Sequence, residues 1–550
     1  MIAPDEWIPA DGMTLEPNAS QAVREQVTNV VVTAGPGAGK TELLAQRADF
    51  LLRTGGCRYP RRILAISFKV DAARNIKERV QQRCGADLAA RFDSFTFHAF
   101  AKRIIDNYRI LLTGKDALAP DYAIDPDYSI PHKQITFDDL VPLAIGILKL
   151  SPHARNSIRQ TYTHVFLDEF QDAKANQYDL LKDIFLDTSA VFTAVGDTKQ
   201  RIMRFAGALD GIMNTFRTDF SAESLTLYQN YRSAPRLRRM QNRMVQAMDP
   251  PAAVPEHEIV GDDGIVNPLA FDSVHDEATA IANLIEGWLA DGVPPHEIAV
   301  LVRQQPHLVC GYLIAELTAR GIACRNDQLR QDLTAEPAAV AVLNLIRVIA
   351  DDHRSAAYEN LMRLVTRSSL TEEMSLRNAR AVSRFLTAKR AQLRECADGR
   401  SDPETWGKVI DEFLDLVTRP VIRALSAEYQ RGDRFDQVLS ETIVAFSTEL
   451  KHDGDPKAAL MRLSEDDAVR IINIHKCKGM EFEKVVVFGV EDELFWGDEN
   501  EAEFFVAISR AKSELILTWA QKRPRPPGVT GRWVVIRHRQ DEFWSYAVEQ

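Results

Sequence analysis

The sequence lacks the cysteine arrangements and the long apolar segments that mark several classes of protein. Its six cysteines include no C-x-x-C pair, and none lies near two histidines at zinc-binding spacing, which argues against a zinc or iron–sulfur module. No segment is long and apolar enough to span a bilayer, and the N-terminus has neither the basic start nor the apolar core of a secretion signal. We therefore expect a reduced, cytoplasmic setting and no membrane partner.

An excess of basic residues is also missing. The 67 lysines and arginines are outnumbered by 78 aspartates and glutamates, which gives a formal net charge of −11. This argues against nucleic-acid binding over the whole surface, but a basic groove in an acidic body would be compatible with it, so the charge leaves a DNA partner open. With 550 residues, 45% of them hydrophobic, the chain is long enough for roughly three or four domains.

The most informative segment that is present is a glycine-rich turn at 34–41, with the sequence AGPGAGKT. It follows the apolar run 30–32 and precedes Leu43 and Leu44, which predicts a strand, a turn and a helix start in that order. Backbone N–H groups in such a turn converge on a phosphate, and the helix start favours negative charge. The expected nucleotide ligands are Gly35, Gly37, Gly39, Lys40 for the outer phosphates and Thr41 for Mg²⁺. A chance glycine turn is the alternative, because Ala34 stands where the strict pattern has glycine.

Strand and helix patterns alternate after this loop. Apolar runs at 63–68, 163–167 and 191–195 predict strands, and 72–80 predicts a helix. Strands that alternate with helices indicate an α/β fold with a parallel sheet. Because the carboxyl ends of such strands meet at one edge of the sheet, we expect Lys40 and Asp168 to lie close together.

Composition divides the chain into two α/β units and a helical insertion. Residues 250–267 are rich in proline, glycine and aspartate and are expected to form a linker or surface loop, and 298–302 and 484–488 predict strands of a second unit. From 333 to 460 the apolar residues fall at helical spacing. The predicted parts are 1–222 for the first unit, 223–332 with 461–520 for the second, 333–460 for the helical insertion and 521–550 for a basic tail. A solvated end and a nucleic-acid or partner contact are both open for the tail.

Two acids directly follow the strand predicted at 163–167. Phosphoryl hydrolysis needs one carboxylate for the metal and a neighbour that orients or deprotonates water, so we assign Asp168 to Mg²⁺ and Glu169 to the water. A helix N-cap cluster is the alternative interpretation of a paired acid, and the upstream phosphate loop disfavours it.

Two arginines are candidates for neutralising charge on the transferred phosphate. Arg232 lies in QNYRS and Arg510 in AISRAK, just before a predicted strand at 515–517. A guanidinium stays charged and can bind a phosphate through two N–H groups. Considered alone, either residue would be a surface arginine, since most arginines are.

Taken in order, the motifs resemble those of the UvrD/Rep/PcrA group of superfamily 1 (subfamily A) DNA helicases, over about 15–520. They are AGPGAGKT, ILAISFKVDAARNIKERV, SFTFHAF, VFLDEFQD, VGDTKQRIMRFAGA, LYQNYRS, VRIINIHKCKGMEFEKVVVFG and FFVAISRAKSEL. The resemblance implies two RecA-like parallel-sheet domains that hydrolyse ATP with Mg²⁺ between them. It also implies movement along single-stranded DNA or at single-strand/duplex junctions, usually 3′ to 5′.

The resemblance also implies roles for individual residues. Gln200 would sense the γ-phosphate, Tyr231 would stack on adenine, and Gly479 and Glu481 would line the nucleotide site. The positions that meet the DNA strand in this family correspond here to Phe68, Thr96, His98, Phe205 and His475. Aromatic side chains can stack on any base, which supports such a path, although core packing is the alternative for Phe68 and Phe205.

The sequence departs from the family in ways that affect what it implies. Gln21 is displaced from the slot of the adenine-recognising glutamine, and Met203 and Ala206 replace an aromatic residue and an arginine. The stretch at about 108–136 is much shorter than the accessory domain that relatives usually carry there, so contacts with duplex DNA should be fewer. No fused nuclease is visible.

Three hypotheses about function follow. The first is an ATP-dependent DNA translocase or helicase in DNA repair or anti-phage defence. The second is an ATP-gated DNA sensor that activates a separate nuclease, as in compact Gabija-like defence helicases. The third is a degenerate ATPase that acts as a scaffold, which the intact Lys40, Thr41, Asp168 and Glu169 argue against.

Overall fold

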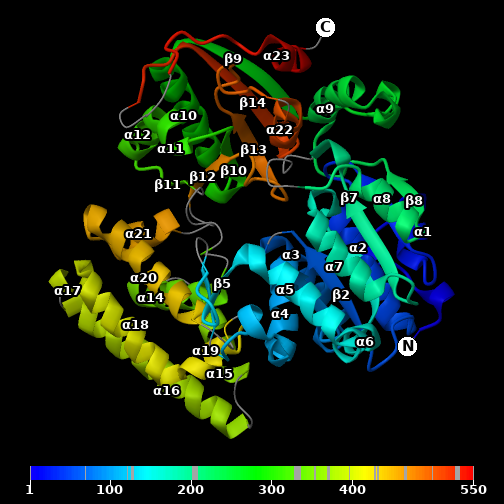
Figure 1. The fold of residues 1–550 in the computed structure, drawn as a ribbon. Helices are drawn as coiled ribbons and strands as arrows, with labels where there is room; N and C mark the ends of the chain where they lie inside the picture. The colour runs from blue at the N-terminus through cyan, green and yellow to red at the C-terminus, as the bar shows by residue number, and fades with distance from the viewer. Residues whose placement is uncertain are drawn as a thin grey trace.

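The chain folds into two α/β units and one helical unit (Figure 1). The computed structural model describes residues 2–68, 70–120, 122–125, 129–200, 208–326, 333, 336–351, 355–367, 372–395, 397–426, 429, 433–463, 468–497, 499–526 and 533–548. Each α/β unit contains a six-stranded sheet in which every strand pairing is parallel, so the predicted fold class is confirmed. None of the described helices is long and apolar enough to cross a membrane.

The first sheet has the strand order β3-β2-β6-β7-β1-β8. Its strands are β1 (Val30–Ala34), β2 (Arg62–Ser67), β3 (Phe92–Thr96), β6 (Tyr162–Leu167), β7 (Val191–Gly196) and β8 (Glu223–Leu227). We expected 223–227 to open the second unit, and that boundary is wrong, because β8 pairs with β1 over its whole length. Without β8, the backbone groups along one side of β1 would lack a strand partner.

Helices cover both faces of this sheet because successive residues of its strands point to opposite sides. Val30 and Val32 pack into one apolar cluster with α1 (Pro17–Arg24), α2 (Lys40–Thr54) and α3 (Val70–Ala89). Val31 packs into the cluster on the other face. The helices of that face are α4 (Phe97–Tyr108), α5 (Phe137–Leu150), α6 (Pro152–Thr161), α7 (Ala175–Phe185) and α8 (Ile212–Asp219). The short strands β4 (Ala123–Asp125) and β5 (Gln134–Thr136) form the reduced accessory region.

The second sheet has the order β11-β12-β10-β13-β14-β9. Its strands are β9 (Ile265–Ser273), β10 (Ile298–Val302), β11 (Cys324–Asn326), β12 (Val469–Asn473), β13 (Phe482–Val487) and β14 (Ala511–Lys522). The predicted linker 250–267 therefore ends inside β9, an edge strand that the sequence pattern did not reveal. Pro268 lies within β9, and proline is tolerated there because the backbone N–H groups on the outer side of an edge strand donate no hydrogen bond to a neighbouring strand. The helices of this unit are α9 (Pro235–Met248), α10 (Val274–Ala290), α11 (Pro306–Val309), α12 (Gly311–Ala319), α22 (Asn500–Ile508) and α23 (Asp541–Ala547).

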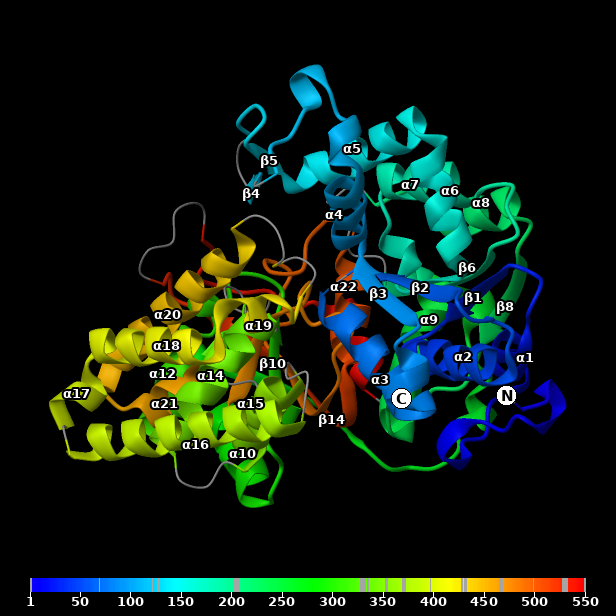
Figure 2. The same ribbon diagram turned by 90° about the horizontal axis from the view of Figure 1, so that it is seen from below.

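A helical unit lies between β11 and β12 in the sequence. Its helices are α14 (Pro337–Ala350), α15 (Ser355–Arg367), α16 (Glu372–Glu395), α17 (Ala397–Ser401), α18 (Pro403–Val417), α19 (Arg419–Arg423), α20 (Arg434–Asp453) and α21 (Pro456–Leu463). They enclose an apolar core of their own and, seen from below, form a group apart from the first unit (Figure 2). No strand occurs among the described residues between 336 and 463, so the helical prediction for this stretch is confirmed.

The C-terminal tail packs against the second unit. Arg523, 1% exposed, donates to Glu277 at 2.8 Å and to Glu491 at 2.6 Å, and both carboxylates are fully buried. Arg537 is also buried, and α23 inserts Phe543 into the core of the second unit. A solvated end is therefore wrong for these two arginines, because buried acids from distant parts of the chain take up their charge.

Candidate nucleotide and DNA site

The phosphate loop joins β1 to α2 and has the backbone that its glycines permit. Gly37 and Gly39 have φ of +69° and +77°, and Gly39 is the N-cap of α2, so N–H groups at the start of this helix point outward. A Cβ on Gly37 would lie 2.2 Å from Asn230 Oδ1, so the neighbouring segment also requires glycine there. Lys40 Nζ donates to the carbonyl oxygens of Ala34 and Gly35, each at 3.3 Å, which holds its ammonium over the loop.

Two carboxylates lie at the carboxyl end of β6, close to this loop. Burial and the neighbouring Glu169 raise the pKa of Asp168. Burial would also raise the pKa of Glu169, but Lys40 and Lys478 outweigh it, so this pKa is lowered and Glu169 stays ionised. Glu169 has φ of +51°, a strained conformation for a residue with a side chain, and its carboxylate accepts a hydrogen bond from Gln171 at 2.6 Å.

Lys478, which follows β12, crosses from the second unit to these carboxylates. Its ammonium lies 2.5 Å from Asp172 Oδ2 and 3.8 Å from Glu169 Oε2, and it donates to the backbone oxygen of Gln200 at 2.7 Å. The Lys478 side chain is only 4% exposed. It therefore forms a buried charged contact between the two units. We did not assign it from the sequence, although it directly precedes Gly479, which we expected to line the nucleotide site.

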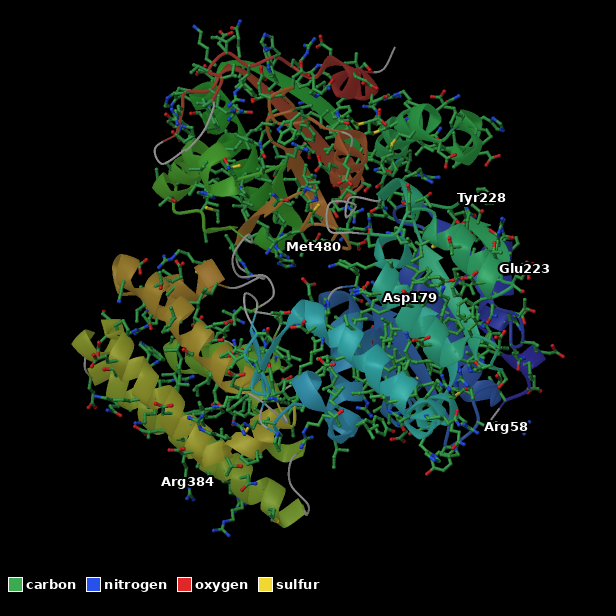
Figure 3. All side chains as sticks on the ribbon, in the orientation of Figure 1. Arg58, Asp179, Glu223, Tyr228, Arg384 and Met480 are labelled. Atoms are coloured by element: carbon green, nitrogen blue, oxygen red, sulfur yellow. The ribbon has the colours of Figure 1, made fainter. Side chains whose placement is uncertain are left out.

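Arg510 also crosses between the units. It follows α22, is 2% exposed, and donates through Nη2 to Gln200 Oε1 at 2.6 Å. Its other donors bind the backbone oxygens of Val506 and Met480. Burial lowers the pKa of Arg510 to about 10, which still leaves it charged at neutral pH. Met480 lies where the second unit meets the first (Figure 3).

Arg232 and Tyr231 lie on the segment that leads out of β8. Arg232 binds Glu481 Oε2 at 2.8 Å and the Ser509 backbone oxygen at 3.0 Å. Burial would raise the pKa of Glu481, but Arg232 and Lys512 lower it overall. The Tyr231 backbone N–H donates to Gly37 O at 2.9 Å, and Tyr231 as a whole is 61% exposed beside the phosphate loop. Gly479 has φ of +87°, and no neighbouring atom lies within 4 Å of the position that a Cβ would take.

The predicted nucleotide residues thus gather around one junction between the units. The expected proximity of Lys40 to Asp168 agrees with the effect of the Lys40 charge, which opposes the rise in the pKa of Asp168. The same charge helps to lower the pKa of Glu169. A Mg²⁺ ion bound with nucleotide phosphates needs only one or two protein oxygens, and the Thr41 hydroxyl and the buried Asp168 carboxylate fit that requirement. No cluster of three or more metal-ligating side chains occurs among the described residues.

The predicted DNA residues follow strand ends in both sheets. Phe68 follows β2 and is half-buried, while Thr96 ends β3 and accepts a hydrogen bond from the Ala99 N–H at 3.1 Å as the N-cap of α4. His98 lies edge-on to Phe137, with ring centroids 6.0 Å apart, and burial lowers its pKa. His475 follows β12 and binds Glu503 Oε1 at 2.8 Å. Phe205, Met203 and Ala206 lie outside the described residues.

Comparison with known families gives two matches. The UvrD/REP helicase N-terminal domain matches residues 15–134 and 127–221, and the UvrD-like helicase C-terminal domain matches 433–522. The chain is 24% identical to DNA helicase II of Escherichia coli (strain K12), over 93% of this chain and 85% of the relative. It is 24% identical to the ATP-dependent DNA helicase PcrA of Bacillus subtilis (strain 168), with coverages of 92% and 83%. It is likewise 24% identical to the ATP-dependent DNA helicase Rep of Escherichia coli (strain K12), with coverages of 93% and 91%.

Proposed function

Because the chain belongs to the UvrD/Rep helicase family, we propose that it hydrolyses ATP and uses the free energy to move along DNA as a helicase. The observation that carries the proposal is the pair of buried cations, Lys478 and Arg510, that reach from the second unit to the first beside the phosphate loop. Nucleotide bound there would contact both units at once.

The residues around the loop have complementary tasks in hydrolysis. Lys40 and the N–H groups of the loop bind the phosphates, and Thr41 and Asp168 hold the Mg²⁺ that accompanies ATP. Glu169 accepts a hydrogen bond from the attacking water, and its ionised state suits that task. Arg232 and Arg510 offset the charge that develops on the γ-phosphate.

Gln200 can connect hydrolysis to movement of the two units. Its side chain donates to Asp197 Oδ2 at 2.8 Å and accepts from Arg510 at 2.6 Å, so it touches both units. A γ-phosphate that competes for Gln200 or Arg510 would change the strength of the contact between them. Binding and hydrolysis would then shift the cleft between closed and open states.

We assign the DNA path to the carboxyl edges of the two sheets. Phe68, Thr96 and His98 lie at that edge of the first sheet, and His475 lies at that edge of the second. Phe205 is assigned to the path by sequence alone. Single-stranded DNA held by both edges would be gripped and released as the cleft closes and opens, and we propose movement in the 3′ to 5′ direction.

Repair of cellular DNA and defence against phage DNA are both compatible with this activity. The named relatives are DNA helicases, and none of them is named as a nuclease-activating or Gabija-like subunit. The partner-gated alternative therefore has no support among the relatives, and we propose the active motor.

The experiment that tests the proposal measures ATP hydrolysis with and without single-stranded DNA at one fixed low salt concentration, because binding to phosphates is salt-dependent. We expect strong stimulation by DNA. Lys40→Ala and Glu169→Gln should each reduce hydrolysis by at least about 100-fold while leaving the fold intact. Lys149→Ala, at a lysine whose side chain is 68% exposed on α5, is the matched control.

Two outcomes would contradict the proposal in different ways. Wild-type turnover in folded Lys40→Ala or Glu169→Gln protein would show that the catalytic assignment is wrong. Hydrolysis that DNA does not change would show that the ATPase is not coupled to DNA.

A further inference from the structure

Trp496 stands apart from the other tryptophans of the chain. All seven lie within the described residues, and Trp496 alone is exposed, with 59% of its surface accessible. It lies in the connection from β13 to α22. An exposed indole presents a flat apolar face to solvent, which a planar ligand can cover.

Arg303 packs against the face of the Trp496 ring. The guanidinium carbon of Arg303 lies 4.8 Å from the centroid of the Trp496 ring. Each nitrogen of this guanidinium already donates within the protein: Nε to Glu503, Nη1 to the Leu494 backbone oxygen at 2.7 Å, and Nη2 to the Trp496 backbone oxygen at 2.6 Å. Arg303 therefore holds the indole and its backbone in one orientation.

The residue before Trp496 anchors the same turn in the core. Phe495 is 2% exposed and meets the rings of Phe504 and Phe543 edge-on, at 5.8 and 5.6 Å between centroids. The Phe495 N–H donates to the Glu491 backbone oxygen at 2.8 Å. Because Phe495 is fixed inward and Arg303 packs on the indole, Trp496 is held outward and loses less conformational entropy when a ligand binds.

This indole lies at the edge of the sheet to which we assigned the DNA path. Arg303, His475 and the Trp496 turn follow the carboxyl ends of β10, β12 and β13, which are adjacent parallel strands. Glu503 links them directly, since it binds both Arg303 and His475 Nε2, the latter at 2.8 Å. Trp496 and the predicted DNA contact His475 thus belong to one hydrogen-bonded network.

We propose that Trp496 is a stacking platform for a base of single-stranded DNA, an inference that rests on the proposed function. The contact is with a base rather than a phosphate, because Glu503 offsets the charge of Arg303 and three of the five N–H groups of Arg303 already donate within the protein. An aromatic face accepts any base, so the platform holds DNA without reading its sequence.

The test measures binding of a fluorescently labelled oligothymidylate of about 16 nucleotides, and of an abasic oligomer of equal length. Trp496→Ala should raise the Kd for oligothymidylate by about 10-fold or more and leave the Kd for the abasic oligomer unchanged. Trp496→Phe should restore most of the affinity. The dependence of log Kd on log salt should keep its slope, because no phosphate contact is lost.

Tyr59→Ala is the matched control, since Tyr59 is 85% exposed but precedes β2 at the opposite edge of the first sheet. We expect it to bind both oligomers like the wild type. In a second measurement, oligothymidylate should quench the tryptophan fluorescence of the wild type, and most of that quenching should vanish in Trp496→Phe.

The results separate this inference from the proposed function. If the wild type binds oligothymidylate and Trp496→Ala binds it equally well, the stacking platform is wrong and the helicase proposal stands. An equal loss for the abasic oligomer, or a changed salt slope, would also overturn base stacking. If the wild type binds neither oligomer, the DNA function itself fails.

Discussion

Replacing Lys478 with methionine would remove the buried charge that joins the two units. Methionine keeps a similar length but leaves Asp172, whose side chain is 2% exposed, without its ammonium partner at 2.5 Å. Removing one partner of a buried ion pair typically costs about 3–5 kcal/mol. Because this pair lies between two units, opening of the cleft would return water to Asp172, so we expect the lower figure of about 3 kcal/mol.

This loss of free energy should lower the fraction of molecules in which the cleft between the units is closed, and ATP hydrolysis should therefore be slower. About 3 kcal/mol corresponds to roughly a 100-fold loss in kcat/KM for ATP at saturating DNA. Asp172→Asn in the Lys478→Met background should recover about tenfold in kcat/KM, since it removes the buried charge that Lys478 offset. The assay is steady-state ATP hydrolysis by the wild type, both single variants and the double variant, with Lys149→Met as the exposed-lysine control.

The double-mutant cycle can refute this reasoning. If Asp172→Asn lowers kcat/KM by the same factor in the wild type and in Lys478→Met, the two side chains are not energetically coupled. Lys478 would then act through Glu169 or Gln200 alone, or would have no part in closing the cleft.

Three further predictions concern stability. Gly37→Ala should lower the free energy of unfolding by about 2–4 kcal/mol without nucleotide, because the added Cβ would lie 2.2 Å from Asn230 Oδ1 and φ is positive. Gly35→Ala is the control: no atom lies within 4 Å of its Cβ position, so thermal unfolding should be nearly unchanged. Arg523→Met should cost about 3–5 kcal/mol in the same assay, because the buried Glu277 loses the Arg523 guanidinium and the buried Glu491 is left with Arg537, 3.5 Å away. An unchanged melting temperature would contradict this. The hydrogen bond to Glu493 raises the pKa of His538 above 6.5. Burial would raise the pKa of Glu493, but its hydrogen bonds with His538 outweigh burial and lower this pKa below 4.5. The stabilisation by His538 is lost as pH rises and that by Glu493 is lost as pH falls, so the melting temperatures of wild type and His538→Gln should differ most between pH 4.5 and 6.5.

Local patterns predicted the parts of the fold that depend on neighbouring residues. The strands β1, β2, β6, β7, β10 and β13 and the helical unit were predicted from periodicity, because burial on one or both faces imposes a spacing on nearby residues. Strand β9 was missed because its residues are mostly half-exposed at an edge, so they carry no continuous apolar run. Strand β8 was assigned to the wrong unit because a strand's own pattern does not say which sheet it joins.

The phosphate loop and the Asp168–Glu169 pair could be located from local sequence, since each is formed by consecutive residues whose conformation is set by glycine or by the end of a buried strand. Three contacts became visible only in the folded chain: Lys478 with Asp172, 306 residues apart, Arg523 with Glu277 and Glu491, and Arg303 with the Trp496 ring. These contacts join side chains from separate elements, and their partners are chosen by how two sheets and their helices pack. Periodicity records which face of an element is buried, but it does not record what lies against that face.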